Sequence, residues 1–164
     1  NKLKYLYPEN FKNLVNLEEI RLNNNLIDDL DIYSILKNKK IKKLWLDNNR
    51  LRILNGSSFN NGEIKQISLS DNHNLENVYL NQNFDDLTYL NLNHNKKIKF
   101  ISINLKNVAE LYLRNTSLEL IRLLNFKNIY NLRILDLSYN NLSFRVLNSI
   151  PFNLIKNLEN IYFE

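Results

Sequence analysis

The sequence predicts an α/β solenoid, a fold in which short units stack along one axis and share one core. Three observations predict it. First, an apolar pattern recurs at intervals of 21 to 26 residues. Second, a polar residue stands at one fixed place in each of the first six copies, and it is asparagine in all but one of them. Third, tight turns cannot rely on glycine because the chain has only two. The clearest copy runs from Leu132 to Leu142, with apolar residues at its first, fourth, sixth and eleventh places and Asn140 at its ninth.

Seven units fall in phase when each is aligned on its first apolar residue. They begin at Leu17, Ile41, Ile64, Leu87, Val108, Leu132 and Leu158. In a short strand the fourth and sixth places point to one side and the fifth to the other. One unit cannot bury its apolar side alone, so neighbouring strands are expected to pair in parallel. The expected strands lie near 20–22, 44–46, 67–69, 90–92, 111–113, 135–137 and 161–163.

The ninth place is expected to support the stack through side-chain hydrogen bonds. It is occupied by Asn25, Asn49, Asn72, Asn95, Thr116 and Asn140. An asparagine amide can bond backbone groups of neighbouring turns that would otherwise be buried and unpaired. Thr116 offers only a hydroxyl, so we expect a locally weaker ladder there. Asparagine also tolerates left-handed backbone, and we expect it to make the tight turns in place of glycine.

Each unit returns through a second apolar pattern. After Asn49 it comprises Leu51, Leu54 and Phe59, and after Thr116 it comprises Leu118, Ile121, Phe126 and Ile129. The strand pattern L-x-x-L-x-L-x-x-N-x-L with this tail resembles the typical subclass of the leucine-rich repeat family over the whole chain. The resemblance implies a horseshoe with its parallel sheet on the concave face, irregular or short helical convex returns, and a spine of stacked phenylalanines.

Two irregularities concern the layout of the chain. Residues 75–83 spell a second strand motif out of phase with the others, which we interpret as an extended convex segment that belongs to the core. Asn1 and Leu3 fit the ninth and eleventh places of a unit, and the last residues stop inside an expected strand. We therefore expect residues 1–164 to form a single solenoid of about seven repeats, cut at both ends. Its open ends are a second candidate contact surface.

No catalytic, cofactor or metal site is expected. The chain lacks cysteine, which excludes disulfides, thiolate metal ligands and a cysteine nucleophile. Two isolated glycines cannot form a phosphate-binding loop. His73 and His94 fall at neighbouring turns, but without further ligands they are expected to be solvated surface residues. No apolar run reaches the roughly 18 residues that a membrane span needs.

The outward strand positions are the candidate binding surface. Aromatic residues and arginine supply most of the binding energy in protein interfaces, and several stand here among mixed charges. The alternative interpretation is that aromatic residues are present only because they favour strands. The candidate partner-binding residues are Arg21, Lys43, Trp45, Tyr89, Asn91, Tyr112, Arg114, Asp136 and Tyr162.

The net charge of +5 is not spread evenly. The second, third, fifth, seventh and eighth places together carry six Lys or Arg and eight Asp or Glu, although the whole chain has 22 and 17. Basic residues instead cluster at residues 37–40 and 96–99. Nucleic-acid binding needs a continuous basic face, so a nucleic acid is not the expected partner.

The leading functional hypothesis is a non-catalytic scaffold that binds a protein partner through its concave face. The family resemblance implies extracellular relatives, such as Toll-type receptor ectodomains and secreted insect immune proteins, and hence an extracellular location and a role in recognition or innate immunity. The alternative is a cytoplasmic regulatory subunit that binds a signalling enzyme. A third class is recognition of a nucleic acid or glycan on the basic flank. Glycosylation sequons begin at Asn55, Asn115 and Asn141 and matter only in a secreted protein.

Overall fold

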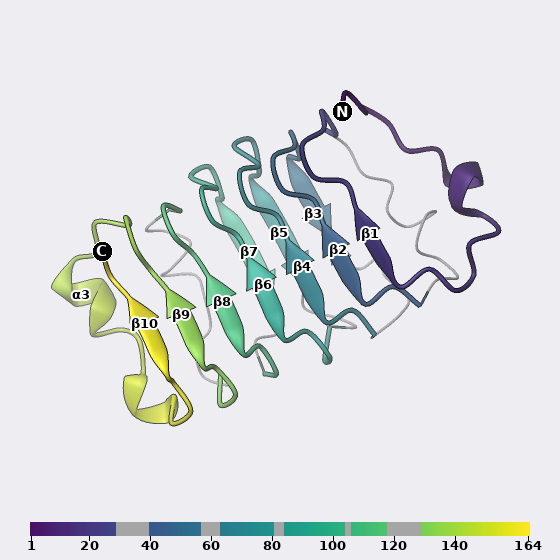
Figure 1. Ribbon diagram of the computed structural model, residues 1–164. Helices are drawn as coiled ribbons and strands as arrows, with labels where there is room; N and C mark the ends of the chain where they lie inside the picture. The colour runs from purple at the N-terminus through teal and green to yellow at the C-terminus, as the bar shows by residue number, and fades with distance from the viewer. Residues whose placement is uncertain (29–39, 57–62, 81–83, 104–105, 118–128) are drawn as a thin grey trace.

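A parallel sheet of seven short strands runs the length of the protein (Figure 1). The computed structural model describes residues 1–28, 40–56, 63–80, 84–103, 106–117 and 129–164. The strands, in spatial order, are β1 (Glu19–Arg21), β2 (Lys43–Trp45), β4 (Gln66–Ser68), β6 (Tyr89–Asn91), β8 (Glu110–Tyr112), β9 (Ile134–Asp136) and β10 (Asn160–Tyr162). Each begins one residue before the position expected, so the third to fifth places of the unit form the paired strand.

The register of this sheet aligns equal places of successive units. Leu44 of β2 pairs with Ile20 on one side and Ile67 on the other, and the same correspondence continues to β10. From β1 to β9 the fourth place is buried, while the third and fifth places point away from the core. Because successive side chains of a strand point to opposite sides, the residues that pack in the core are separated from those on the outer face.

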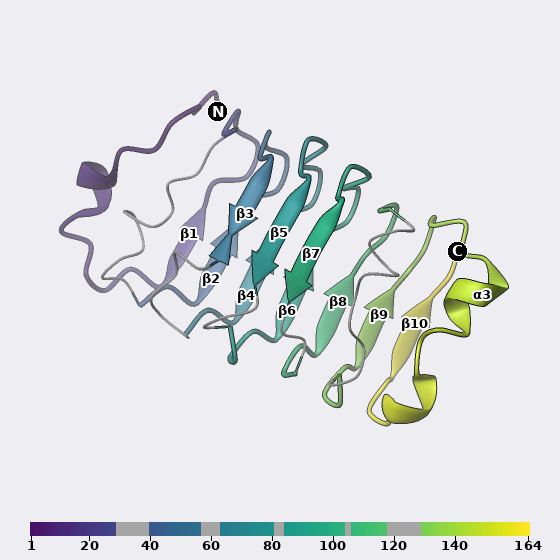
Figure 2. The same ribbon diagram turned by 180° about the vertical axis from the view of Figure 1, so that it is seen from behind.

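Three of the returns form a second parallel sheet on the opposite side (Figure 2). Its strands are β3 (Ile53–Asn55), β5 (Asn77–Leu80) and β7 (Phe100–Ile103). The out-of-phase motif supplies β5, and Leu75, Val78 and Leu80 are fully buried, which confirms its interpretation as an extended core segment. The helical elements in the described part of the chain are each about one turn long: η1 (Pro8–Phe11), α3 (Phe144–Leu147) and η4 (Phe152–Leu154).

One continuous apolar cluster occupies the space between the strands and the returns. It extends from Ile20 to Ile155 and includes the fully buried ring of Phe84. Phe59 and Phe126, which were expected in a phenylalanine spine, lie outside the described residues, so the spine stays a prediction. No helix in the described part of the chain has the length and apolar character required to cross a membrane.

The asparagine ladder is present. The Nδ2 of Asn72 donates to the carbonyl of Leu69 in its own unit and to that of Leu46 in the preceding one, both at 3.0 Å. The asparagines at positions 49, 95 and 140 repeat this double contact. Thr116 donates its hydroxyl to Leu113 of its own unit at 2.9 Å, and no bond to the preceding unit replaces the missing amide among the described residues.

The residue before each ladder position has left-handed backbone. The six positions are Asn24, Asn48, Asp71, His94, Asn115 and Tyr139, with φ between 51° and 63°. Asparagine thus makes three of these turns, as expected, and other residues make the rest. At the beginning of the chain, Leu3 donates its backbone N–H to Asn25 Oδ1, as Ile27 does to Asn49 and Leu51 to Asn72. Leu3 therefore occupies the eleventh place of the pattern.

Candidate functional site

The candidate site is the outer face of the seven-stranded sheet, formed by the third and fifth places of its strands. These side chains point outward because the fourth place between them points into the core. Of the nine residues predicted from the sequence, eight lie on this face, from Arg21 on β1 to Tyr162 on β10. Arg114 lies two residues beyond β8, where the backbone has already begun to turn.

Three of the predicted residues form a row of touching rings, which we call the aromatic row: Trp45, Tyr89 and Tyr112. The ring centroids of Trp45 and Tyr89 lie 5.9 Å apart, edge to face, and those of Tyr89 and Tyr112 lie 5.4 Å apart. Strand β4 separates Trp45 from Tyr89. It presents Ser68 there, a small and buried side chain, so the two larger rings meet across it.

Two carboxylates anchor the ends of the aromatic row. Glu19 accepts hydrogen bonds from Arg21 Nε at 2.8 Å and from Trp45 Nε1 at 2.6 Å, and these bonds, the one from Arg21 first, lower the pKa of Glu19. The hydroxyl of Tyr112 donates to Glu110 at 3.0 Å. Burial, followed by this contact with Glu110, raises the pKa of Tyr112 above its usual range. The polar groups of both rings are therefore hydrogen-bonded, and both side chains stay half-buried at the surface.

Sequence reasoning missed both anchoring carboxylates. Glu110 stands two residues before Tyr112, on the same side of the same strand, and this spacing was a usable signal. Glu19 is 26 residues from Trp45 along the chain and reaches it only because β1 and β2 pair in register. That contact results from the stacking of two units, and no short stretch of the sequence predicts it.

A third carboxylate lies partly buried beside the row. Asp47 accepts hydrogen bonds from the Ser68 hydroxyl and from the backbone N–H of Ser70, the latter at 2.8 Å. Burial raises the pKa of this carboxyl, although the bonds from serine act in the opposite direction. Burial also raises the pKa of Tyr89 nearby. The centre of the face is thus partly desolvated, which disfavours the charged forms of Asp47 and Tyr89.

The other predicted residues lie on either side of the aromatic row, toward the two ends of the face. Arg21 and Lys43 are exposed on β1 and β2. Tyr112, Asp136 and Tyr162 occupy one register position on β8, β9 and β10. Asn91 on β6 accepts the backbone N–H of Asn93 at 3.0 Å. The guanidinium of Arg114 lies 4.1 Å from the ring centroid of Tyr139.

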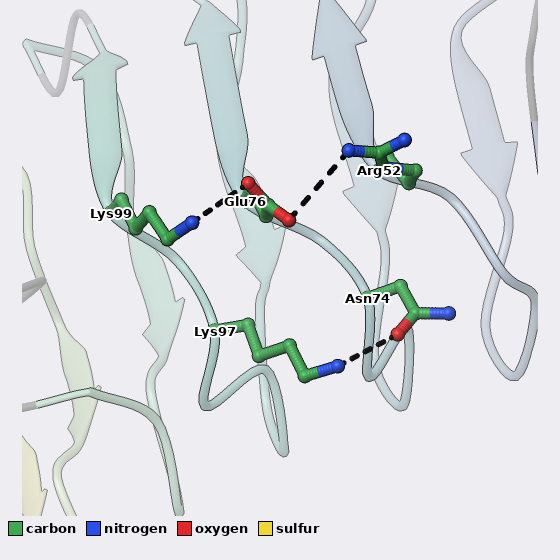
Figure 3. A network of polar contacts seen from close by, with 5 residues as sticks. All are labelled: Arg52, Asn74, Glu76, Lys97 and Lys99. Atoms are coloured by element: carbon green, nitrogen blue, oxygen red, sulfur yellow. Dashed lines mark hydrogen bonds and ion pairs between the residues drawn. The ribbon is translucent and has the colours of Figure 1, made fainter.

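Two lysines of the basic cluster at residues 96–99, Lys97 and Lys99, lie on the opposite side and are engaged within the protein (Figure 3). Lys99 pairs with Glu76 at 3.0 Å, Arg52 approaches the other oxygen of Glu76 at 3.9 Å, and Lys97 donates to Asn74 at 3.0 Å. These contacts join successive returns. Residues 37 and 39 of the other basic cluster lie outside the described residues.

The two histidines do not form a ligand pair. His73 Nδ1 lies 3.2 Å from the backbone oxygen of His94, and His94 Nδ1 lies 3.0 Å from the amide of Asn115. Within the described ranges no group of three or more histidine, aspartate or glutamate side chains is placed to hold a metal ion.

Comparison with known proteins places the fold. No protein-family model matches the sequence, and no curated protein matches it either. Among solved structures, internalin C2 from Listeria monocytogenes superposes with a TM-score of 0.50 at 19% sequence identity, over 90% of this chain and 71% of that one. Similarity at this level of identity concerns the fold alone. Together with the in-phase strands and the asparagine ladder, it shows that the chain folds as a leucine-rich repeat solenoid.

Proposed function

We propose that the chain is a non-catalytic recognition module that binds a protein partner through the outer face of its seven-stranded sheet. The aromatic row of Trp45, Tyr89 and Tyr112 is the observation that supports this function most directly. Large aromatic side chains at the centre of a surface, surrounded by polar groups, are the usual source of binding energy in protein interfaces. The face carries such a centre with Arg21 and Asp136 near its two ends.

The geometry of the row favours a contact surface over a mere preference of aromatic residues for strands. The rings pack on one another and are tied by hydrogen bonds to Glu19 and Glu110. Side chains held in this way lose little conformational freedom when a partner arrives. An ordered, partly desolvated aromatic surface therefore binds at a lower entropic cost than a row of free side chains.

The test uses the chain as bait with proteins of its source organism, followed by mass spectrometry and a binding assay with the purified partner. We expect Trp45→Ala and Tyr112→Ala each to weaken binding by at least about tenfold, the effect of a central aromatic residue. The matched control is Tyr79→Ala, because Tyr79 is a half-buried aromatic residue on β5 of the second sheet. Thermal unfolding of every variant separates loss of contact from loss of fold.

Two results would contradict the proposal. In the first, Tyr79→Ala weakens binding as much as the two variants of the aromatic row. In the second, Trp45→Ala and Tyr112→Ala reduce binding only in proportion to a lower melting temperature. The row would then be structural, and the function would have to be sought elsewhere on the solenoid.

The proposed setting is extracellular, as the resemblance to the typical repeat subclass implies, with receptor-type or immune recognition as the role. A signal peptide in the full-length gene would support it. An initiator methionine followed directly by repeats would favour the cytoplasmic alternative, a regulator of a signalling enzyme. Glycan mass is a second test. Asn55 and Asn141 are exposed sequon residues, whereas Asn115 is half-buried and bonded to His94, so peptides containing Asn55 or Asn141 are the ones to examine.

A further inference from the structure

We propose that the β8–β10 part of the sheet face receives a lysine or arginine side chain of the protein partner, with Asp136 as its counter-ion between Tyr112 and Tyr162. The inference rests on the proposed function, because it specifies the chemistry of a partner bound to that same face. Three independent observations carry it: the register of these residues, the distribution of charge, and the contact already made by Arg114.

The register places an anion between two aromatic rings. Asp136 on β9 pairs with Tyr112 on β8 and with Tyr162 on β10. Neighbouring strands lie about 4.8 Å apart, and all three residues occupy the outward fifth place. Tyr162 is 43% exposed, and the far side of Tyr112 rests against Tyr89. A cation above Asp136 would therefore meet a carboxylate below it and a tyrosine on either side, the surroundings that favour ammonium and guanidinium groups.

The third and fifth places on this part of the face are acidic. From β6 to β10 the third and fifth places carry Glu110 and Asp136 but no lysine or arginine, while Arg21 and Lys43 stand at the β1–β2 end. Among the described residues, no cation lies within ion-pair distance of either carboxylate. Within the described ranges, the one hydrogen bond that the Asp136 carboxylate accepts comes from the backbone N–H of Ser138, at 2.9 Å.

The nearby cations of the chain are already engaged. Arg133 forms two hydrogen bonds of 2.8 Å with Glu159, and the guanidinium of Arg114 lies over the ring of Tyr139. The second contact shows that a tyrosine ring at this end of the solenoid can hold a cation. The carboxylate of Asp136 has no such cation, so it can pair with one supplied by a partner, whereas it would repel an acidic segment.

The experiment titrates the isotope-labelled chain with short peptides and follows backbone amide resonances by NMR. The probes are acetyl-Gly-Lys-Gly-amide and acetyl-Gly-Arg-Gly-amide. Their neutral counterparts contain Nε-acetyl-lysine and citrulline. We expect the cationic peptides to shift resonances of β8 to β10 at millimolar concentration, and the neutral peptides to leave them in place. Asp136→Asn should weaken binding about five- to tenfold, as the loss of a charge-assisted contact does.

The control variant is Asp86→Asn, which removes the same charge at an exposed position outside the sheet. Asparagine at position 136 retains an oxygen to accept the Ser138 N–H, so the fold should persist, and the amide spectrum verifies this. The inference is overturned if the neutral peptides bind as well as the cationic ones, if no peptide binds, or if Asp136→Asn binds as tightly as the parent chain.

The purified partner distinguishes failure of this inference from failure of the proposed function. If Trp45→Ala abolishes partner binding while Asp136→Asn and added salt leave it unchanged, the recognition face stands and the cation site is wrong. If Trp45→Ala leaves partner binding intact, the proposed function fails, whatever the peptides do. Weakening of partner binding by both variants supports both proposals.

Discussion

At the scale of single residues, Gly56 shows how closely the returns pack. A Cβ atom at this position would stand 2.5 Å from Cε2 of Phe84 and would also clash with the backbone oxygen of Tyr79. Phe84 is almost fully buried, so its ring cannot move aside without disturbing the core. Gly56 is therefore required for close approach and not for a turn, since its φ is not positive.

We expect Gly56→Ala to lower the free energy of unfolding by about 1–3 kcal/mol, the usual cost of overpacking a core. Denaturant unfolding measures it. Asp86→Ala, at an exposed position, should change stability by no more than about 0.5 kcal/mol. Equal effects from the two substitutions would mean that the backbone near Gly56 adapts without cost.

The burial of Asp47 predicts that its contribution to stability depends on pH. Its pKa is raised from the ordinary value of 3.8, chiefly by burial, so the folded chain holds this proton more tightly than the unfolded chain does. The free energy of unfolding contributed by Asp47 therefore falls as pH rises from the unfolded pKa through the folded pKa. Asp47→Asn removes the charge but keeps an oxygen for Ser68 and Ser70.

We expect the stability of Asp47→Asn relative to the parent chain to be more favourable at pH 7 than at about pH 3. Thermal or denaturant unfolding at the two pH values provides the comparison. A difference that does not change between them would show that Asp47 gains as much from its hydrogen bonds as it loses through burial.

At the scale of the structural element, the asparagine ladder has one weak rung. The Thr116 hydroxyl donates to the carbonyl of Leu113 in its own unit and to Asn140 Oδ1 of the next unit, but to no carbonyl of the preceding unit among the described residues. Asn72 and Asn140, in contrast, each donate to carbonyls of their own and of the preceding unit. We expect Thr116→Asn to raise the free energy of unfolding by about 1 kcal/mol, the net value of a typical buried hydrogen bond. Thr116→Val, which keeps the shape but loses the hydroxyl, should lower it by a similar amount.

Both Thr116 variants are compared with the parent chain by denaturant unfolding. A stabilising Thr116→Val would show that the hydroxyl gains nothing from Leu113 and Asn140. A destabilising Thr116→Asn would show that this turn has no room for the amide. Either result would show that the hydrogen bonds at this ladder position do not contribute to stability as those of the neighbouring units do.

At the scale of the whole molecule, one continuous core couples all the units. Leu111 on β8 is fully buried in the same cluster as Leu44, which neighbours Trp45 on β2. Trp45 is the only tryptophan and therefore reports on one end of the stack. In a repeat protein each unit contacts its neighbours only, so cooperativity depends on how strongly the interfaces couple.

We expect Leu111→Ala to lower the free energy of unfolding by about 2–5 kcal/mol and to shift two transitions equally: Trp45 fluorescence and far-UV circular dichroism. The parent chain, measured by both methods, is the reference. A shift confined to circular dichroism would show that the β8 region unfolds separately from the β2 region.

The sequence by itself determined the strands, the residues that point inward and the positions of the ladder. All three depend on local spacing: alternation along a strand and recurrence of the unit. The same spacing identified Trp45, Tyr89 and Tyr112 as outward residues. In the seven-stranded sheet the boundaries of the strands differed by one residue, because the spacing identifies the apolar residues and not the residues whose backbones pair.

Only the tertiary structure decided which outward side chains meet. The bond from Trp45 to Glu19 spans 26 residues, and the contact of Trp45 with Tyr89 crosses a strand whose small Ser68 leaves room. The pairing of β3, β5 and β7 likewise depends on how returns of different lengths stack. These contacts depend on the register between neighbouring units and on the sizes of the side chains that meet there. A periodic pattern repeats the same information in every unit and specifies neither of these.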